Sequence, residues 1–153
     1  MLEIFIDADG CSVKEETYKV ATRYRLKVYV VANQYLNVPM DTLVEMKMVS
    51  GGFDAADDWI AESISDGDIL ITSDLLLADR AIKKQACVIG PKGHELTEEN
   101  IGNVLGAREL AAHLRDLGQK KTGPSAMTKT DRSQFLSKLD QVIQNIQRTR
   151  PKS

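Results

Sequence analysis

Aromatic residues are scarce in this chain. Phe, Trp and Tyr together make up 5% of its 153 residues, and there is a single Trp. Single-stranded nucleic acids are often bound by aromatic side chains that stack on successive bases. So few aromatic residues argue against a surface of that kind.

Cysteine and histidine are also rare, with two of each: Cys11, Cys87, His94 and His113. No Cys-x-x-Cys pair occurs, so a zinc site built from Cys and His is not expected. Two isolated cysteines do not form a disulfide framework, and we expect both to be reduced thiols.

Long apolar segments are absent. No apolar run approaches the roughly 20 residues that a membrane-spanning helix needs. The first residues, MLEIFID, lack the basic segment and the cleavage site of a signal peptide. We therefore expect a cytoplasmic protein that does not enter a membrane.

What is present is the composition of an ordinary globular domain, 42% hydrophobic and 27% charged. The formal net charge of −2 hides an uneven distribution. Residues 1–114 carry 11 Lys and Arg against 19 Asp and Glu, a net −8, whereas residues 115–153 carry 9 against 3, a net +6. An acidic body with a basic tail favours a polyanionic partner, although a basic tail also aids solubility. We expect an α/β domain over residues 1–118, with a basic linker and C-terminal helix over residues 119–153 packed on the same domain.

Strand-like and helix-like segments alternate along the chain. Five short apolar or β-branched runs are expected to be strands: residues 2–6, 27–32, 44–49, 68–73 and 86–89. Helical patterns lie over residues 12–24, 54–64, 75–84 and 97–117, and a last amphipathic helix follows Asp131. This order predicts an open, mostly parallel five-stranded sheet with helices on both faces.

Two of the helix starts have the spacing of a capping box. Ser12 precedes Glu15 by three residues, and Asp131 precedes Gln134 in the same way. We expect these pairs to begin the first and the last helix.

Aspartates directly follow two of the expected strands. Asp7 and Asp9 come after the first strand, and Asp74 comes after the fourth. Ligands of open α/β sheets bind beyond the carboxyl ends of the strands, at the point where the strand order reverses. If the first and fourth strands are neighbours, these three carboxylates meet at that point.

A second acidic group starts the helix expected over residues 54–64. Asp54, Asp57 and Asp58 are spaced i, i+3, i+4, so they share one helical face at the same edge of the sheet. Asp54 is also well placed as an N-cap, and Asp58 as an exposed surface charge. Asp74 is equally suited to cap the helix that follows it.

Clustered carboxylates repel one another, and a divalent cation relieves that repulsion. Oxygen ligands favour Mg²⁺ or Mn²⁺, held by one or two carboxylates together with water. Asp58 is a further candidate catalytic residue, and Thr72 is a candidate donor to a metal-bound carboxylate. The candidate metal ligands, which are also candidate catalytic residues, are four aspartates: Asp7, Asp9, Asp57 and Asp74.

Three further residues are candidates for binding a substrate. Asn33 follows the second strand, where its amide suits either a phosphate or the capping of a loop. Lys129 and Arg132 lie near the start of the last helix, a favourable place for a phosphate. Both also suit an ordinary charged surface.

Several motifs occur together in this chain: Asp7-Ala-Asp-Gly-Cys11, Asp54-Ala-Ala-Asp-Asp58, and Gly67-Asp-Ile-Leu-Ile-Thr-Ser-Asp74. With the later Gly123-Pro124, they resemble the bacterial YaiI/YqxD family. The resemblance covers nearly the whole chain, and the family is described as uncharacterised and PIN-domain-like.

The resemblance implies a sheet ordered 3-2-1-4-5 and an acidic metal site of the kind used in RNA cleavage. By the resemblance, Asp7 matches the acidic residue that ends strand one, and Asp74 matches the one that ends strand four. Asp57 or Asp58 would be the acidic residue in the middle of the chain.

Three functions are compatible with these residues. The leading one is a Mg- or Mn-dependent nuclease that hydrolyses RNA or single-stranded nucleic acid. The second is a non-catalytic, metal-stabilised module that binds RNA or another partner. The third is a haloacid-dehalogenase-like phosphatase with Asp7 as nucleophile and Asp9 as acid. It is disfavoured because the Asp57-Asp58 pair precedes the strand of Thr72 instead of following it.

Overall fold

The computed structural model describes residues 2–8, 11–51, 54–99, 101 and 127–149. Their strands form one sheet in the order β3-β2-β1-β4-β5-β6. All neighbours are parallel except β5 and β6, which are antiparallel. The six strands are β1 (Glu3–Asp7), β2 (Lys27–Ala32), β3 (Val44–Met48), β4 (Ile69–Ile71), β5 (Cys87–Ile89) and β6 (Glu95–Leu96).

The predicted α/β class and the order of the first five strands are confirmed. The number of strands is six instead of five, because the chain turns back after β5. Within this turn Gly90 N–H donates to the His94 carbonyl at 2.8 Å, and Gly93 N–H donates to the Gly90 carbonyl at 3.0 Å. A two-residue strand such as β6 is too short to show a periodic pattern, so the sequence did not reveal it.

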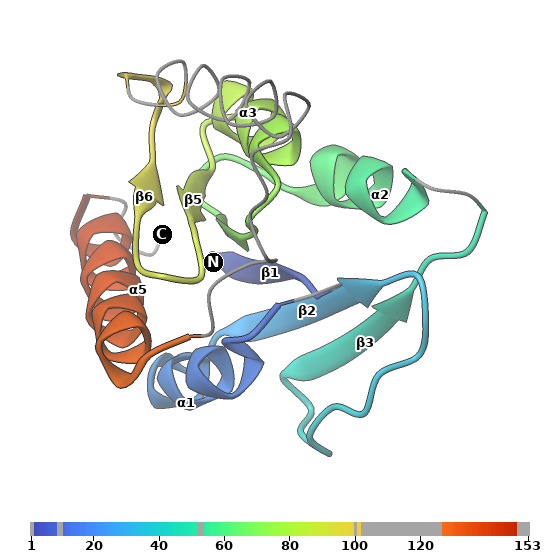
Figure 1. The fold of residues 1–153 in the computed structure, drawn as a ribbon, viewed down its shortest axis with the longest axis horizontal. Helices are drawn as coiled ribbons and strands as arrows, with labels where there is room; N and C mark the ends of the chain where they lie inside the picture. Colours follow the sequence, from blue (N-terminus) through green and yellow to red (C-terminus); the bar gives the residue numbers. More distant parts are fainter. Residues whose placement is uncertain (1, 9–10, 52–53, 100, 102–126, 150–153) are drawn as a thin grey trace, which may run out of the picture.

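Helices cover both faces of the sheet (Figure 1). On one face lie α1 (Lys14–Tyr24) and α5 (Lys129–Thr149), and on the other lie α2 (Ala55–Ser63) and α3 (Leu75–Lys83). Alternate residues of a strand point to opposite faces, so Ile4 and Ile6 join one buried cluster while Phe5 joins the other. The sheet is therefore the middle of three layers, with a hydrophobic core on each side.

The last helix is part of this core. Phe135, Leu139 and Ile143 of α5 are fully buried in the same cluster as Ile4 and Ile6 of β1. The boundary expected between residues 118 and 119 lies outside the described residues, as do most of the helix expected over residues 97–117 and the linker that follows it.

The two capping boxes were predicted wrongly. α1 begins at Lys14 after Val13, and no side chain caps it. A capping box is present at the start of α5, but its first residue is Thr128, three residues before the expected Asp131. Thr128 N–H donates to the Asp131 carboxylate at 3.1 Å, and Asp131 N–H donates to the Thr128 hydroxyl at 3.0 Å. Asp131 is therefore the third helical residue and not the N-cap, because the threonine before it has the same Thr-x-x-acid spacing.

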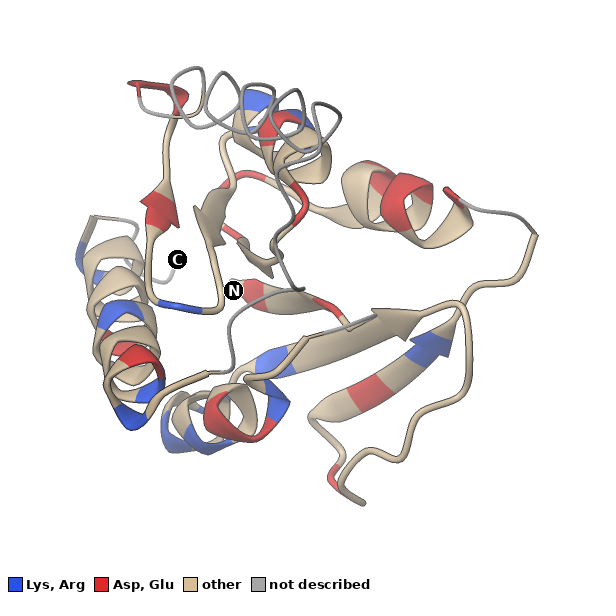
Figure 2. Ribbon diagram, viewed as in Figure 1, with Lys and Arg blue, Asp and Glu red and all other residues tan. Residues whose placement is uncertain are grey.

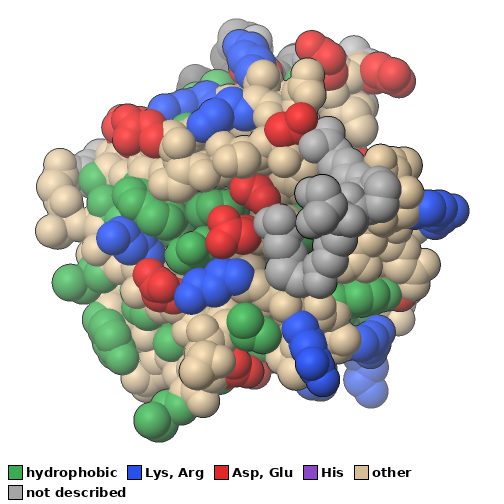
Figure 3. All heavy atoms as spheres, turned by 180° about the vertical axis from the view of Figure 1, so that it is seen from behind, with side chains coloured by type: hydrophobic (Ala, Val, Ile, Leu, Met, Phe, Trp, Pro, Cys, Tyr) green, Lys and Arg blue, Asp and Glu red, His purple; other side chains and the backbone are tan. Residues whose placement is uncertain are grey.

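Basic and acidic side chains alternate across the face seen from behind, with hydrophobic ones between them (Figure 3).

Within the part of the chain that the structure describes, no helix has the length and apolar character needed to cross a membrane.

Candidate active site

The carboxyl ends of β1 and β4 lie side by side. The two strands are parallel neighbours, with Ile4 opposite Ile69 and Ile6 opposite Ile71. Asp7 ends β1, and Asp74 lies three residues beyond the end of β4. The predicted adjacency of these strands is confirmed, and it places both aspartates where the strand order reverses. Asp9, the third expected member of this group, lies outside the described residues.

Thr72 joins the two strand ends. Its hydroxyl donates to the Asp7 carboxylate at 2.7 Å and accepts the backbone N–H of Asp74 at 2.9 Å. The side chain is only 2% exposed, so these bonds are protected from water. A buried hydroxyl with both partners satisfied holds Asp7 in one orientation, as the sequence predicted for this threonine.

Asp74 also caps α3. One of its carboxylate oxygens, Oδ1, accepts the backbone N–H groups of Leu76 at 2.9 Å and Leu77 at 3.2 Å. The second oxygen, Oδ2, takes no part in the cap. The capping role and the candidate metal-binding role of Asp74 are therefore compatible, since they use different oxygens.

Asp57 completes the acidic group from the first turn of α2. The pKa of Asp57 is raised to about 6. Partial burial is the largest cause, and the negative charges of Asp7, Asp74 and Asp54 add to it. Arg80 opposes the rise. Because the charges of Asp7 and Asp74 are among the causes of this rise, after burial, the three carboxylates lie close enough to interact electrostatically. We call these three residues the acidic triad.

Asp58, next to Asp57 in sequence, belongs to a different contact. Its carboxylate pairs with the Arg80 guanidinium of α3 at 2.9 Å, and both side chains are largely exposed. Successive residues of a helix point about 100° apart, which explains why Asp57 interacts with Asp7 and Asp74 while Asp58 pairs with Arg80. Asp79 forms an i,i+4 ion pair with Lys83 on the surface of α3.

The donor set fits a hard divalent cation. All donors of the triad are carboxylate oxygens, and the raised pKa of Asp57 reports a repulsion that a cation would relieve. Among the described residues, no three His, Cys, Asp or Glu side chains are already arranged to hold an ion. Mg²⁺ and Mn²⁺ need only one or two protein carboxylates and complete their shells with water, so metal binding by the triad stays a prediction.

The three candidate substrate-binding residues have different surroundings. Asn33 is exposed just beyond the end of β2. Lys129 is exposed at the first position of α5. Arg132 instead contacts α1, donating to the Ser12 carbonyl at 2.9 Å and to the Glu16 carboxylate at 3.0 Å.

Figure 2 shows acidic residues on α2 and at the end of β1, basic residues in the turn between β5 and β6, and residues of both signs on α1 and α5. The sequence did not indicate that Arg80 pairs with Asp58, because a contact between two helices depends on how they pack. It also gave no sign that Lys92 of the β5–β6 turn lies near α5.

Comparison with known proteins identifies relatives along the whole chain. A family model described as "Uncharacterized BCR, YaiI/YqxD family" matches residues 5–145. A UPF0178 protein of Rhodospirillum centenum is 49% identical over 98% of this chain and 100% of its own length. A UPF0178 protein of Bradyrhizobium diazoefficiens is 48% identical over 96% of this chain and 88% of its own length.

No solved structure matches the chain, so the expected likeness to PIN domains stays a prediction. The match to the family model and the full-length relatives agree with each other and with the motifs of the sequence. The chain belongs to the YaiI/YqxD family.

Proposed function

We propose that this protein is a metal-dependent nuclease that hydrolyses RNA or single-stranded nucleic acid at the acidic triad. The observation that carries the proposal is the pKa of Asp57, raised to about 6 by burial and by Asp7, Asp74 and Asp54. Perturbed carboxylates at the switch point of an α/β sheet are typical of active sites.

Mg²⁺ or Mn²⁺ would be held by Asp7 and by the Oδ2 oxygen of Asp74. When bound, such an ion lowers the pKa of a water molecule and offsets negative charge on a phosphate group. Thr72 keeps the Asp7 carboxylate in position, because its hydroxyl is itself held by the backbone of Asp74.

Asp57 is the carboxylate best suited to accept a proton. A general base works best when its pKa lies near the working pH, and about 6 is closer to neutrality than the ordinary value of 3.8. Asp57 is also a candidate metal ligand, and the two roles make different predictions. A ligand is needed for metal affinity, whereas a base is needed for turnover by the metal-loaded protein.

The test is hydrolysis of labelled single-stranded RNA, single-stranded DNA and duplex RNA, with Mg²⁺, Mn²⁺ or EDTA. We expect metal-dependent cleavage by the wild type and a loss of at least 100-fold in Asp7→Asn and Asp57→Asn, the scale on which acid–base catalysis contributes. Asp58→Asn is the matched control, since Asp58 is adjacent in sequence but paired with Arg80. Cleavage that persists in Asp7→Asn, or that falls equally in Asp58→Asn, would contradict the proposal.

A non-catalytic, metal-stabilised binding module is the second candidate. Binding of single-stranded RNA without cleavage, in the presence of either metal, would support the module over the nuclease.

A further inference from the structure

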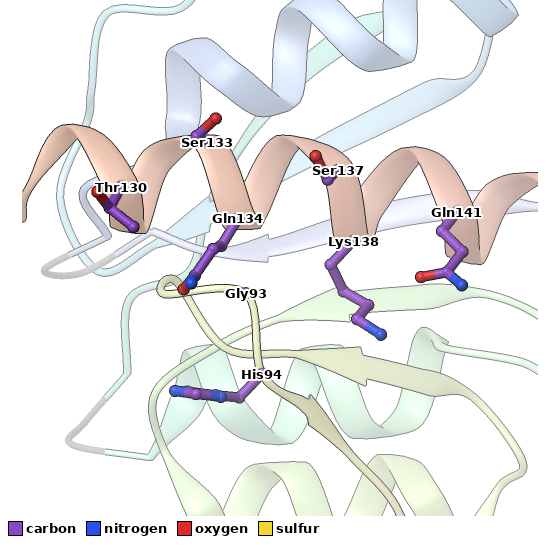
Figure 4. Close-up of a pocket in the computed structure, with 8 residues that line it drawn as sticks. All are labelled: Gly93, His94, Thr130, Ser133, Gln134, Ser137, Lys138 and Gln141. Carbon is purple, nitrogen blue, oxygen red and sulfur yellow. The ribbon is translucent and has the colours of Figure 1, made fainter.

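A polar groove lies between α5 and the hairpin formed by β5 and β6 (Figure 4). Its volume is about 550 Å³. The hairpin turn touches α5 at Gly93, where a Cβ atom would lie 2.7 Å from the backbone carbon of Gln134. Because Gly93 also has a φ of +89°, glycine is required here both for its conformation and for the close approach. This contact fixes one end of the groove.

The lining of the groove is rich in hydrogen-bonding groups. From α5 come hydroxyl and amide side chains at helical spacing, including Ser133, Ser137 and Gln141. Lys138 also projects from α5 toward the hairpin, and His94 approaches from the hairpin itself (Figure 4). None of the described residues that line it is an Asp, a Glu or a large aliphatic residue, although Glu95 lies near Lys138. Pockets for drug-like molecules are mostly apolar, so this lining favours a polar ligand rich in acceptor oxygens.

Two lysines, Lys138 and Lys92, lie at this groove, each with a carboxylate near it. Lys138 lies 3.9 Å from the Glu95 carboxylate, at the outer limit of an ion pair. The pKa of Asp131 is lowered, mainly by hydrogen bonding from Thr128, with a contribution from the nearby charges of Lys92 and His94. Lys92 and His94 therefore face the first turn of α5, beside the hairpin end of the groove.

The hairpin turn at one end of the groove lies at the same edge of the sheet as Thr72. Gly90, at the start of the hairpin turn, lies beside Thr72, and a Cβ atom on Gly90 would be 4.0 Å from the Thr72 carbonyl oxygen. Thr72 N–H donates to the Ile89 carbonyl at 3.3 Å. The residue that orients Asp7 is thus in direct contact with the base of the hairpin.

We propose that this groove binds the sugar–phosphate backbone of a single-stranded nucleic acid and leads the strand toward the acidic triad. Lys138, Lys92 and His94 would contact phosphates, while the hydroxyl and amide groups of α5 would donate hydrogen bonds to phosphate and sugar oxygens. Contacts of this kind position a strand without reading its sequence. The choice of ligand rests on the proposed nuclease function, but the groove is a separate site whose contribution to binding is measurable without catalysis.

The experiment measures the binding of fluorescein-labelled 12-nucleotide U and T oligomers, RNA and DNA respectively, by anisotropy over a range of salt concentrations. All proteins carry Asp7→Asn so that no cleavage interferes. The test variant is Lys92→Gln with Lys138→Gln. The charge-matched control is Lys19→Gln with Lys83→Gln, which removes two exposed lysines from the surfaces of α1 and α3. Thermal unfolding of each protein verifies that it is folded.

We expect the test variant to bind about 10-fold more weakly than its parent at low salt, for both oligomers. Its slope of log affinity against log salt should be smaller by about 1.4, or roughly 0.7 for each lost phosphate contact on a single strand. The control should change less than twofold. Ser137→Glu, which places a carboxylate in the groove without removing a lysine, should also weaken binding and is a second, independent variant.

Equal weakening in the test and control variants would overturn the proposal, because only total charge would then matter. Unchanged binding in both the lysine variant and Ser137→Glu would overturn it as well. The outcomes also distinguish the groove from the proposed nuclease function. Weakened binding in these variants without any cleavage by the wild type would support the groove and reject the nuclease. Cleavage with an unchanged KM in the lysine variant, with Asp7 intact, would support the nuclease and reject the groove.

Discussion

The hydroxyl of Thr72 donates to the carboxylate of Asp7 at 2.7 Å, across 65 residues of sequence. The same hydroxyl accepts the backbone N–H of Asp74. One buried oxygen atom therefore connects two members of the acidic triad, and its removal should affect stability and activity together.

We predict that Thr72→Val, which keeps the shape but removes the hydroxyl, lowers the free energy of unfolding by about 2 kcal/mol, because the Asp74 N–H loses its partner. Thr72→Ser keeps the hydroxyl and loses only a methyl group, so about 1 kcal/mol is expected. Urea unfolding followed by the fluorescence of Trp59, the only tryptophan, measures both. In the cleavage assay the serine variant should retain more activity than the valine variant. The reverse order would show that Thr72 contributes through packing and not through its hydroxyl.

Asp57 should make stability depend on pH in an unusual direction. Its pKa in the folded protein, about 6, is above the ordinary value of 3.8, so the folded state binds the proton more tightly than the unfolded state between these values. Stability is therefore lost as the pH rises from about 4 to 6, and the cost is fully present above that range.

Asp57→Asn removes this cost. Each pKa unit corresponds to about 1.4 kcal/mol, and screening by solvent reduces the effect for a partly exposed carboxylate. We expect the variant to be about 1 kcal/mol more stable than the wild type at pH 7.5 in EDTA, with no gain at pH 3.5. Urea titrations at the two pH values test this. Asp58→Asn serves as the control, and a variant less stable than the wild type at pH 7.5 would be inconsistent with repulsion in the triad.

Divalent cations should stabilise the fold through the triad. A ligand that binds only the folded state contributes about 2.7 kcal/mol at 100 times its Kd, which raises the Tm of a chain of this length by about 5–10 °C. Differential scanning fluorimetry with Mn²⁺ or Mg²⁺ measures the shift, and Asp7→Asn should lose most of it. Shifts of the same size in both proteins would rule out Asp7 as a ligand.

We expect Arg132 to contribute mainly to the stability of the fold and less to substrate binding. It bonds to the Ser12 carbonyl and to Glu16, whose side chain is only 16% exposed. The other oxygen of Glu16, Oε1, is buried with no hydrogen-bond partner among the described residues. We predict that Arg132→Gln lowers stability by about 1–2 kcal/mol, because it leaves a half-buried carboxylate uncompensated.

A double-mutant cycle with Glu16→Gln isolates the pair. The double variant should be more stable than the sum of the single losses implies, with a coupling energy of at least 0.5 kcal/mol, the lower end for contacting residues. If the effects of the two substitutions simply add, Arg132 is an independent surface charge and remains available to a substrate.

The positions of the first five strands were predictable from local patterns, whereas their order was implied by the family resemblance. The apolar run before Asp7 and the run before Asp74 each identify a buried strand, and the pattern of alternating elements limits how such strands can be arranged. Their adjacency then places both aspartates at one edge without any knowledge of side-chain contacts. Asp74 was likewise recognisable as a cap from its position alone.

Other features depended on contacts that the sequence does not encode locally. Asp57 and Asp58 are adjacent residues of the same type, and they differ only in the direction in which their side chains point from α2. The Ser12–Glu15 pair has the spacing of a capping box, yet α1 starts at Lys14, because spacing does not determine where the backbone first becomes helical. Such features are determined by packing between helices.

The burial of β1 by α5 has a consequence for how the protein is made. Ile4 and Ile6 leave the ribosome well before α5, whose Phe135 and Leu139 help to cover them. At about 5–20 residues per second, roughly 7 to 27 seconds separate the synthesis of Ile4 from that of Leu139. During this interval the apolar face that carries Ile4 and Ile6 lacks the cover of α5, so α1, transient contacts or chaperones must shield it until α5 emerges.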